Sequence, residues 1–518
     1  MNSIAVSPLE TLPNDILFII LLAVELTDVL SLRQTCRRLH TLGSDDYLWH
    51  RLVRRFSLPL DAPRNVDLST LSGAELQSLL VKALRLDRNW RKTPPQIRQC
   101  RSIVYGADSS RVDDMQLLPG GRWLATAERA FPGGFRCTIM NIWSLKDTGQ
   151  FHRAITFRIT GHYYRFSWAY QKDENHATMA IATDHDPRHK NILQIYEIPL
   201  IDEFESDVPH LSAPRLKKSV MKPPDARGLV SEVCVSEGIV AISFFDLEEN
   251  DLGSAHYFLI VDSKTGSERL YHPVFVEHYH RFNLRIGSDC ILLLGAVGSE
   301  VIAHILDLSD DTTQPSTSPS GSGRPAVISP ELTPPGDFVV TLGPGREFIV
   351  SLTPKQPSNK IPHRVTFLSF SALSRVDTST GVGHAARVAL TDHSPRHKSS
   401  STKSQLSGPS AHSIDNVEWP FTNMTSIRLP QIGYRRAVWI EQNWITEQHR
   451  LMKLSWPLKE EEGGAEDEKS AFSVGVLLPP NTSLPFVPEG ITCMTFDETT
   501  GRLCVGLITG DLWVLDYS

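Results

Sequence analysis

The stretch LPNDILFIILLAVELTDVLSLRQTCRRLHTLGSDDYLWHRL, residues 12–52, decides how the rest of the chain is interpreted. Its nine-residue apolar run, from Ile16 to Val24, is too short to cross a bilayer, because a membrane-spanning helix needs about 20 apolar residues. No Lys or Arg precedes the run, and the first basic residue is Arg33, whereas a secretory signal has a basic segment in front of its apolar core. We therefore expect neither a membrane span nor a secretory signal here.

Helical spacing runs through the whole stretch. Thr11-Leu12-Pro13 is a typical helix start, and apolar residues then recur at helical spacing, at Ile16, Leu17, Ile20, Leu21 and Val24. Phe18, Ile19 and Leu22 extend the apolar character to other faces, so this helix must be covered on more than one side. About four short helices are expected, and a unit of roughly 40–50 residues is rarely stable alone. The pattern therefore favours docking.

Several positions at fixed spacing make the stretch similar to a known family: Leu12-Pro13, Asp15-Ile16-Leu17, Asp28-Val29-Leu30, Leu32-Arg33, Cys36-Arg37, Leu39 and Leu48-Trp49. They resemble the pattern of an F-box. Asp15 and Thr35 depart from its commonest residues, Glu and Val, without changing the apolar face. A plain helical subdomain packed on the rest of the chain is the alternative.

The resemblance implies that residues 12–56 bind a Skp-type adaptor protein and, through it, a cullin ubiquitin ligase. The residues that we expect as apolar anchors against the adaptor are Leu12, Pro13, Ile16, Leu17, Leu30, Leu32, Cys36, Leu48 and Trp49. Residues 1–11 would form an N-terminal tail.

Residues 57–99 are expected to form a helical linker. Ser72 and Glu75 have the spacing of a capping box. Apolar residues at i, i+3, i+4 and i+7 follow from Leu76, predicting an amphipathic helix that ends near Asn89. Asn89-Trp90-Arg91 resembles the hinge between F-box and propeller in F-box/WD-type proteins.

After residue 100 the pattern changes to short strands separated by turns. The last 28 residues predict strands at 491–496 and 502–508 and a third ending at Asp516, with turns at Gly501 and Gly510. Such antiparallel triplets resemble the blade of a WD-like β-propeller. Seven similar units begin near residues 112, 164, 230, 281, 338, 425 and 491.

The fold class expected is therefore α+β and multidomain, with a helical F-box and linker followed by an all-β propeller of seven blades at 100–518. Because a free sheet edge invites aggregation, residues 101–105 should pair alongside residues 512–516 and close the ring. A pair of β-sandwiches is the competing all-β interpretation. Three segments that are poor in apolar residues are expected to be disordered insertions: 309–336, 374–416 and 458–471.

Composition restricts the function classes. The length of 518 residues indicates more than one structural unit. The net charge of −7 argues against a general nucleic-acid binder. Seven dispersed cysteines without a Cys-x-x-Cys pair indicate an intracellular protein, of cytoplasm or nucleus, with no zinc site. No nucleophile-elbow, zinc-protease or phosphate-loop motif occurs.

We therefore expect a non-catalytic adaptor with no metal, cofactor or membrane partner. Its F-box would bind the Skp-type adaptor, and its propeller would bind a substrate protein of unknown identity. Two alternatives remain: a propeller scaffold without a ligase role, and a propeller hydrolase or lyase, which would need a cluster of His, Asp or Glu residues in the central channel.

Overall fold

The computed structural model describes most of the chain. The described residues are 12–62, 66–103, 111–146, 151–171, 175–183, 191–200, 213–221, 229–236, 238–245, 256–271, 279–286, 290–297, 300–307, 326–328, 338–344, 347–353, 363–371, 380–390, 411–422, 425–456, 473–478 and 484–518.

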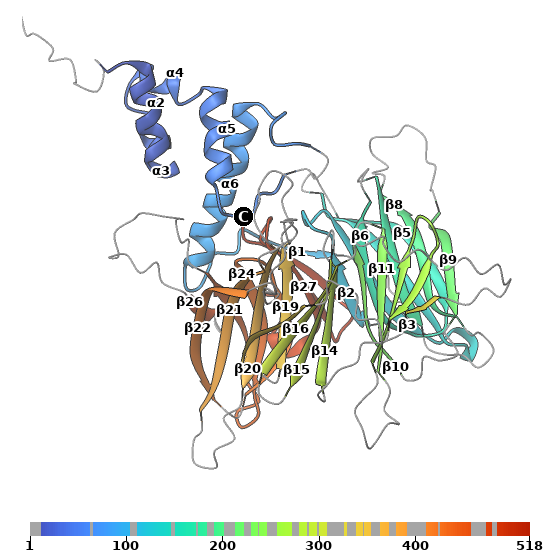
Figure 1. The fold of residues 1–518 in the computed structure, drawn as a ribbon. Coiled ribbons are helices and arrows are strands. Elements are labelled where there is room, and N and C mark those ends of the chain that lie inside the picture. Colours follow the sequence, from blue (N-terminus) through green and yellow to red (C-terminus); the bar gives the residue numbers. More distant parts are fainter. Residues whose placement is uncertain are drawn as a thin grey trace, which may run out of the picture.

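The N-terminal region is helical (Figure 1). Four short helices come first: α2 (Asn14–Ala23), α3 (Leu26–Leu32), α4 (Arg37–Leu42) and α5 (Asp46–Arg55). Asp45 caps α5 by accepting a hydrogen bond from the Tyr47 amide at 2.8 Å. The expectation of short helices in this stretch is confirmed.

A longer helix, α6 (Gly73–Arg91), connects these helices to the rest of the chain (Figure 1). Its capping box is the one predicted, because Ser72 accepts a hydrogen bond from the Glu75 amide and the Glu75 carboxylate accepts one from the Ser72 amide. Nineteen residues at 1.5 Å each make it about 28 Å long.

After α6, the described residues are mainly β structure and form seven sheets. Sheet 1 contains β2 (Asp114–Leu117), β3 (Trp123–Ala130), β4 (Cys137–Ser144) and β5 (His152–Thr160). Sheet 2 contains β6 (Tyr163–Tyr170), β7 (His176–Thr183), β8 (Asn191–Pro199) and β9 (Arg215–Met221). Sheet 3 contains β10 (Leu229–Ser236), β11 (Ile239–Phe245), β12 (His256–Asp262), β13 (Glu268–Tyr271) and the parallel strand β17 (Ala326–Ile328).

Sheets 4 to 7 are antiparallel and four-stranded. Sheet 4 contains β14 (Tyr279–Ile286), β15 (Cys290–Val297), β16 (Glu300–Asp307) and β18 (Phe338–Pro344). Sheet 5 contains β19 (Glu347–Thr353), β20 (His363–Ser371), β21 (Thr380–Leu390) and β22 (Ala411–Thr422). Sheet 6 contains β23 (Thr425–Ile432), β24 (Arg436–Asn443), β25 (His449–Ser455) and β26 (Ser473–Val476). Sheet 7 contains β27 (Ile491–Asp497), β28 (Arg502–Leu507), β29 (Leu512–Asp516) and β1 (Gln99–Ile103). One-turn 3-10 helices, η1 (Pro132–Gly134) and η3 (Pro488–Gly490), lie between β3 and β4 and before β27.

Sheet 7 joins the two ends of the β region. Strand β1 pairs antiparallel with β29, with Gln99 opposite Asp516 and Ile103 opposite Leu512. The predicted pairing with residues 512–516 is confirmed, but the strand covers residues 99–103 rather than 101–105, and residues 104 and 105 lie outside the described residues. A strand that begins the β region therefore completes the sheet that ends it.

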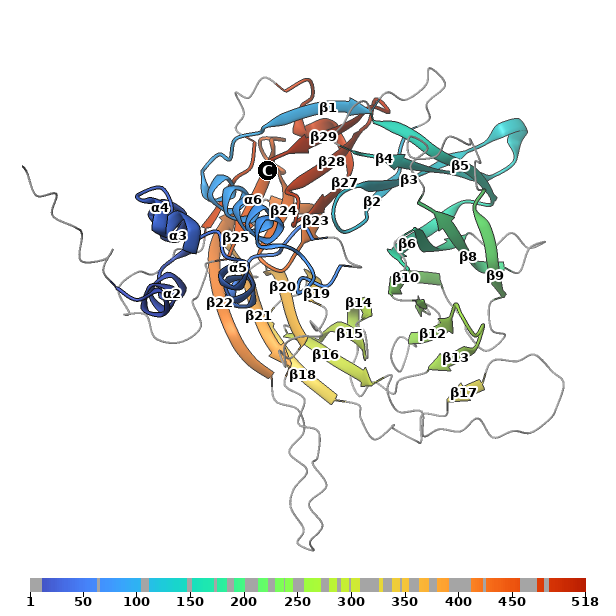
Figure 2. The ribbon, with the colours of Figure 1, turned by 90° about the horizontal axis from the view of Figure 1, so that it is seen from above.

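The strand named first for each sheet above contacts the strand named first for the next sheet. These contacts join β6 to β10, β10 to β14, β14 to β19, β19 to β23, β23 to β27 and β27 to β2. Between β2 and β6, the Gln116 side-chain amide donates to the Phe166 carbonyl at 2.7 Å. Figure 2 shows the sheets arranged around a common centre, with their first strands innermost.

Two details differ from the expectation. Residues 338–341 were expected to begin a new unit, but β18 pairs with β16 and is the last strand of sheet 4. Strands β17, β21 and the first part of β22 also lie inside two of the segments that were expected to be disordered, 309–336 and 374–416. The other residues of these two segments, and all of 458–471, lie outside the described residues.

The strands of sheet 5 have a packing reason to form. Gly383 lies opposite Trp419 in the register, and a side chain at position 383 would overlap the Trp419 ring, to which an added Cβ would come within 2.3 Å. Trp419 and Ala385 are both buried. A few buried contacts of this kind order two strands whose surroundings are rich in Ser, Thr and His.

Candidate functional site

The first helix, α2, is apolar on two opposite faces. Leu17 and Leu21, each 1% exposed, face the core of the helical region. Ile16 and Ile19 lie on the other side and are 43% and 63% exposed. Ala23 is also exposed and shares this face at helical spacing, and Pro13, which immediately precedes the helix, is exposed as well. We call Pro13, Ile16, Ile19 and Ala23 the α2 strip.

Arginine side chains hold both ends of α2. Arg38 donates to the Leu12 carbonyl and, at 2.6 Å, to the Asn14 side chain. Arg55 of α5 donates to the Leu22 carbonyl at 2.9 Å. The α2 strip is therefore presented to solvent on a helix that is fixed at both ends.

Trp49 and Leu48 belong to the interior of the helical region. Both side chains are fully buried, and the Trp49 indole donates to the Gly43 carbonyl at 2.9 Å. The Arg33 guanidinium lies 5.7 Å from the centre of the Trp49 ring, and burial lowers its pKa. These side chains stabilise the domain and are not available on its surface.

The nine expected anchors therefore fall into three groups. Pro13 and Ile16 are exposed, and Leu17, Leu48 and Trp49 are buried in the chain itself. The remaining four are half-buried at the edge of the same core: Leu12, Leu30, Leu32 and Cys36. Ile19 was not among the nine, although it is the most exposed large apolar residue of α2. Its position three residues after Ile16 was the signal that could have identified it.

The N-terminal half of α6 belongs to the same helical core. Leu76 and Leu80 are fully buried in a cluster with Leu17, Leu48 and Trp49. The Asp46 carboxylate at the start of α5 accepts a hydrogen bond from the Gly73 amide at 2.7 Å. An acidic group at a helix N-terminus is favourable, because the exposed amides there carry partial positive charge.

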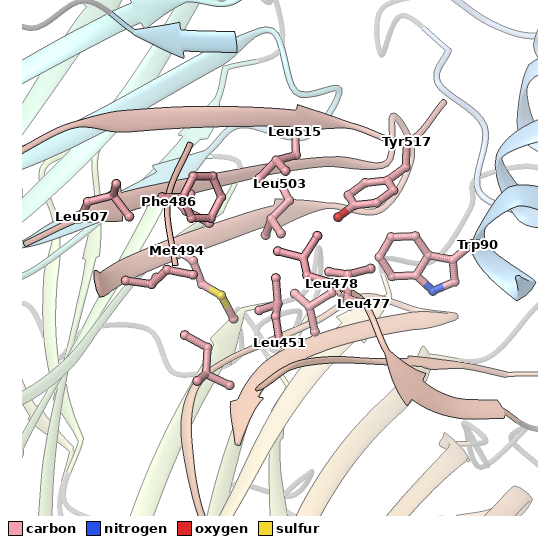
Figure 3. Packing of buried hydrophobic residues seen from close by; sticks show 14 of the residues in the cluster. Trp90, Leu451, Leu477, Leu478, Phe486, Met494, Leu503, Leu507, Leu515 and Tyr517 are labelled. Atoms are coloured by element: carbon pink, nitrogen blue, oxygen red, sulfur yellow. The ribbon is translucent and has the colours of Figure 1, made fainter. Parts of the chain in front are cut away.

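The C-terminal half of α6 is embedded in the β region. Figure 3 shows Trp90 packed beside Tyr517, Leu477 and Leu478. Its ring stacks on Phe496 at 5.1 Å between centres, and its indole nitrogen donates to the Leu454 carbonyl at 3.3 Å. The helix is thus held by sheets 6 and 7 together.

A buried polar network completes this joint. Arg436 donates to the Asp87 carboxylate at 3.4 Å and to the Glu498 carbonyl at 2.8 Å. The Glu498 carboxylate accepts a hydrogen bond from the Arg435 amide at 2.6 Å. Burial raises the pKa of Glu498, while the nearby Arg436 charge opposes that shift.

Asn89 and Lys453 secure the end of the helix. Asn89 donates to the carbonyls of Gln96 and Tyr517, both at 2.7 Å. Lys453 donates to the Trp90 carbonyl, and burial, together with the nearby Arg436 charge, lowers its pKa to about 8. With both halves packed, α6 is a stiff connection between the two regions.

Comparison with known proteins identifies the helical region. Residues 9–55 match the model of the F-box-like family. No curated protein matches the chain. The chain thus has an F-box-like domain at its N-terminal end, followed by a mostly β domain with several four-stranded sheets.

Two other kinds of site, a metal site and a membrane span, are not seen in the described part of the chain. Its His, Cys, Asp and Glu residues form no group of three or more that could hold a metal ion. None of its helices is both long enough and apolar enough to cross a membrane.

Proposed function

We propose that the chain is a non-catalytic substrate-recognition subunit of a cullin-type ubiquitin ligase. The F-box-like domain binds a Skp-type adaptor, and the β domain binds the substrate protein. Ubiquitin transfer itself belongs to other subunits. The observation that carries the proposal is the exposed α2 strip on a domain that matches the F-box-like family.

The adaptor site that we propose differs in detail from the nine anchors expected first. The α2 strip supplies most of the contact surface, and the half-buried residues Leu12, Leu30, Leu32 and Cys36, at the edge of the helical core, add to it. Leu17, Leu48 and Trp49 act from inside, by holding α2 in place. A few apolar anchors typically supply most of the binding energy of such an interface.

We further propose that residues 100–518 form a seven-bladed, WD-like propeller closed by β1, with residues 12–56 as the F-box and 57–99 as the linker. The contacts between successive first strands support this architecture. The pairing of β1 with β29 supports its closure. A closed ring leaves only short, protected sheet edges.

The packing of α6 supports the proposal, because this helix connects the two binding surfaces rigidly. A ligase subunit must hold its substrate at a defined distance from the enzyme that delivers ubiquitin. Trp90, Asp87 and Asn89 fix one half of α6 to the β domain, while Leu76 and Leu80 fix the other half to the F-box-like domain. One continuous helix therefore sets the relative position of the two binding surfaces.

Co-purification with a Skp-type adaptor tests the proposal. The change is Ile16→Asp with Ile19→Asp on the intact chain. Both side chains are exposed to solvent in the free chain, so the fold should tolerate the change, whereas two charges would be buried at the interface. Since each anchor is worth about 2 kcal/mol, we expect adaptor recovery to fall at least tenfold.

The matched control is Leu216→Asp with Met221→Asp on β9, which are 50% and 61% exposed in the β domain. It introduces the same charges and should leave adaptor recovery unchanged. Circular dichroism checks that the helices persist in both variants. Full adaptor recovery with the α2 variant would reject the proposed site, and no recovery with the intact chain would favour the scaffold without a ligase role.

A further inference from the structure

A second exposed apolar surface lies at the end of the β domain that is distant from α6. The turn between β27 and β28 lies at the α6 end, because Gly501 packs against Leu86. The next hairpin, at Ile508, is therefore at the opposite end of β28, about 20 Å away at 3.4 Å per residue. The same argument applies to β24. Arg435, just before this strand, donates to the Ser57 carbonyl near the helices, so the β24–β25 hairpin at the other end of the strand also lies far from α6.

Four large apolar residues are exposed at this far end. Trp444 and Ile445 in the β24–β25 hairpin are 63% and 72% exposed, and Val487, just before η3, and Ile508, just after β28, are 62% and 63% exposed. We call these four residues the tip cluster. Scattered exposed apolar residues are ordinary, but a contiguous group of this size usually marks a contact with another molecule.

Hydrogen bonds connect the segments that carry the tip cluster. The Ile508 amide donates to the Gly490 carbonyl at 2.8 Å, and the Gly490 amide donates to the Val487 carbonyl at 3.0 Å. The His449 amide reaches across from sheet 6 to the Glu489 carboxylate at 3.4 Å. The Asn443 side chain accepts from the Ile445 amide at 2.9 Å and fixes the hairpin tip.

Acidic groups border the tip cluster. Glu447, Glu489 and Asp511 are all exposed at its edge. The exposed Arg450 lies opposite Glu441 in the strand register. The Arg450 charge acts to lower the pKa of the Glu441 carboxyl, although burial has the larger, opposite effect. The positive charge of Arg450 therefore faces a carboxyl of its own. Arg428, which hydrogen-bonds to the uncharged Gln442 side chain, adds one positive charge against these three carboxylates. The border therefore carries net negative charge.

We propose that the tip cluster is the substrate-recognition surface of the β domain, and that it takes a protein segment whose apolar side chains are flanked by Lys or Arg. The inference rests on the proposed function and adds a substrate class to it. Apolar side chains of the segment cover Trp444 and Ile508, while its basic residues meet Glu447, Glu489 and Asp511. The distance from α6 leaves this face clear of the F-box-like domain.

Peptide binding to the intact chain tests the inference by fluorescence anisotropy. The probe is a labelled peptide with a central Phe-Leu pair between two Lys on each side. One comparison peptide replaces every Lys with Glu, and the other replaces Phe-Leu with Ser-Ser. We expect the Lys/Phe-Leu peptide to bind at least tenfold more tightly than either, with an affinity that weakens as salt rises.

Two variants of the chain separate the apolar and electrostatic parts. Trp444→Ser with Ile445→Ser should weaken the Lys/Phe-Leu peptide at least tenfold, whereas Leu216→Ser with Met221→Ser on β9 should not. Glu447→Lys should reduce the preference for the Lys peptide over the Glu peptide at least threefold. Equal binding of all three peptides, or unchanged binding by the Trp444/Ile445 variant, would overturn the inference.

Light scattering of the same samples excludes a different occupant. A parent chain that is dimeric and becomes monomeric in the Trp444/Ile445 variant would assign the tip cluster to a second copy and overturn the proposal. These measurements use no Skp-type adaptor. Failure of peptide binding is therefore distinguishable from failure of the proposed ligase role.

Discussion

Asp114, at the start of the innermost strand of sheet 1, shows how one ionisable residue can affect stability. Burial raises its pKa to about 6, and the nearby Asp113 charge acts in the same direction. The hydrogen bond from the Met115 amide and the charges of Arg165 and Arg129 act in the opposite direction. A carboxyl with a raised pKa binds its proton more tightly in the folded state. Its ionisation therefore destabilises the fold, increasingly as the pH rises from about 4 to 6 and fully above that range.

Asp114→Asn should stabilise the chain at neutral pH. The amide keeps an oxygen that can accept the 2.8 Å hydrogen bond from the Met115 amide, but it never carries the charge. In urea unfolding we expect a gain of up to about 3 kcal/mol at pH 7.5, falling to about 1 kcal/mol or less at pH 4.5. An equal gain at both pH values would contradict this assignment.

Two glycines form a matched pair of residue-scale tests. Gly501 has a φ of +68°, and an added Cβ would lie 2.4 Å from the Leu86 side chain of α6. Nothing lies within 4 Å of the corresponding position at Gly490. We expect Gly501→Ala to lower the free energy of unfolding by about 2 kcal/mol and Gly490→Ala by about 0.5 kcal/mol or less. Thermal unfolding compares them, and similar losses would show that the α6 contact is unimportant.

At the scale of elements, α6 is the part on which both proposed binding surfaces depend. Trp90→Leu removes the stacking on Phe496 and the hydrogen bond to the Leu454 carbonyl. Truncating a buried aromatic residue costs about 3 kcal/mol, and we expect amide exchange to quicken throughout the C-terminal half of α6. The control is Trp444→Leu at an exposed tip, which should leave stability and exchange unchanged. A stable, protected α6 in the Trp90 variant would mean that the joint is held by its polar network alone.

At the scale of the whole molecule, the last strands support the first sheet. One buried cluster combines Trp143 and Leu124 of sheet 1 with Leu512 and Val514 of β29. Arg502 links the same sheets, because it donates to the Asp516 carboxylate at 2.7 Å and to the Gly121 carbonyl at 2.7 Å. Stability is therefore shared across the junction between the beginning and the end of the β domain.

Removing residues 508–518 should lower the melting temperature and accelerate amide exchange in β3 and β4 of sheet 1, although those strands are more than 360 positions away in the sequence. The removed residues include the partner of β1 and the buried Leu512 and Val514. If the truncated chain melts like the parent, or if β3 and β4 keep their protection, the proposed closure is wrong.

Local patterns in the sequence were enough to predict much of the architecture. Helical spacing predicted the short helices before residue 56, and Ser72 with Glu75 predicted the start of α6. Alternation and Gly-containing turns predicted the three strands of sheet 7, and the need for a partner edge predicted the pairing with β1. These features depend on neighbours in the chain, or on one simple requirement of sheets, so composition and spacing determine them.

The tertiary structure decided which apolar residues are covered and by what. The sequence marks Ile16, Leu17 and Trp49 alike as apolar, but only packing against α5 and α6 leaves Ile16 exposed and buries the other two. Likewise, the strand at 338–344 has a pattern that suits either the last strand of one sheet or the first of the next, and its pairing with β16 settles the choice. Burial and pairing depend on residues distant in the chain, and no local pattern of the sequence contains that information.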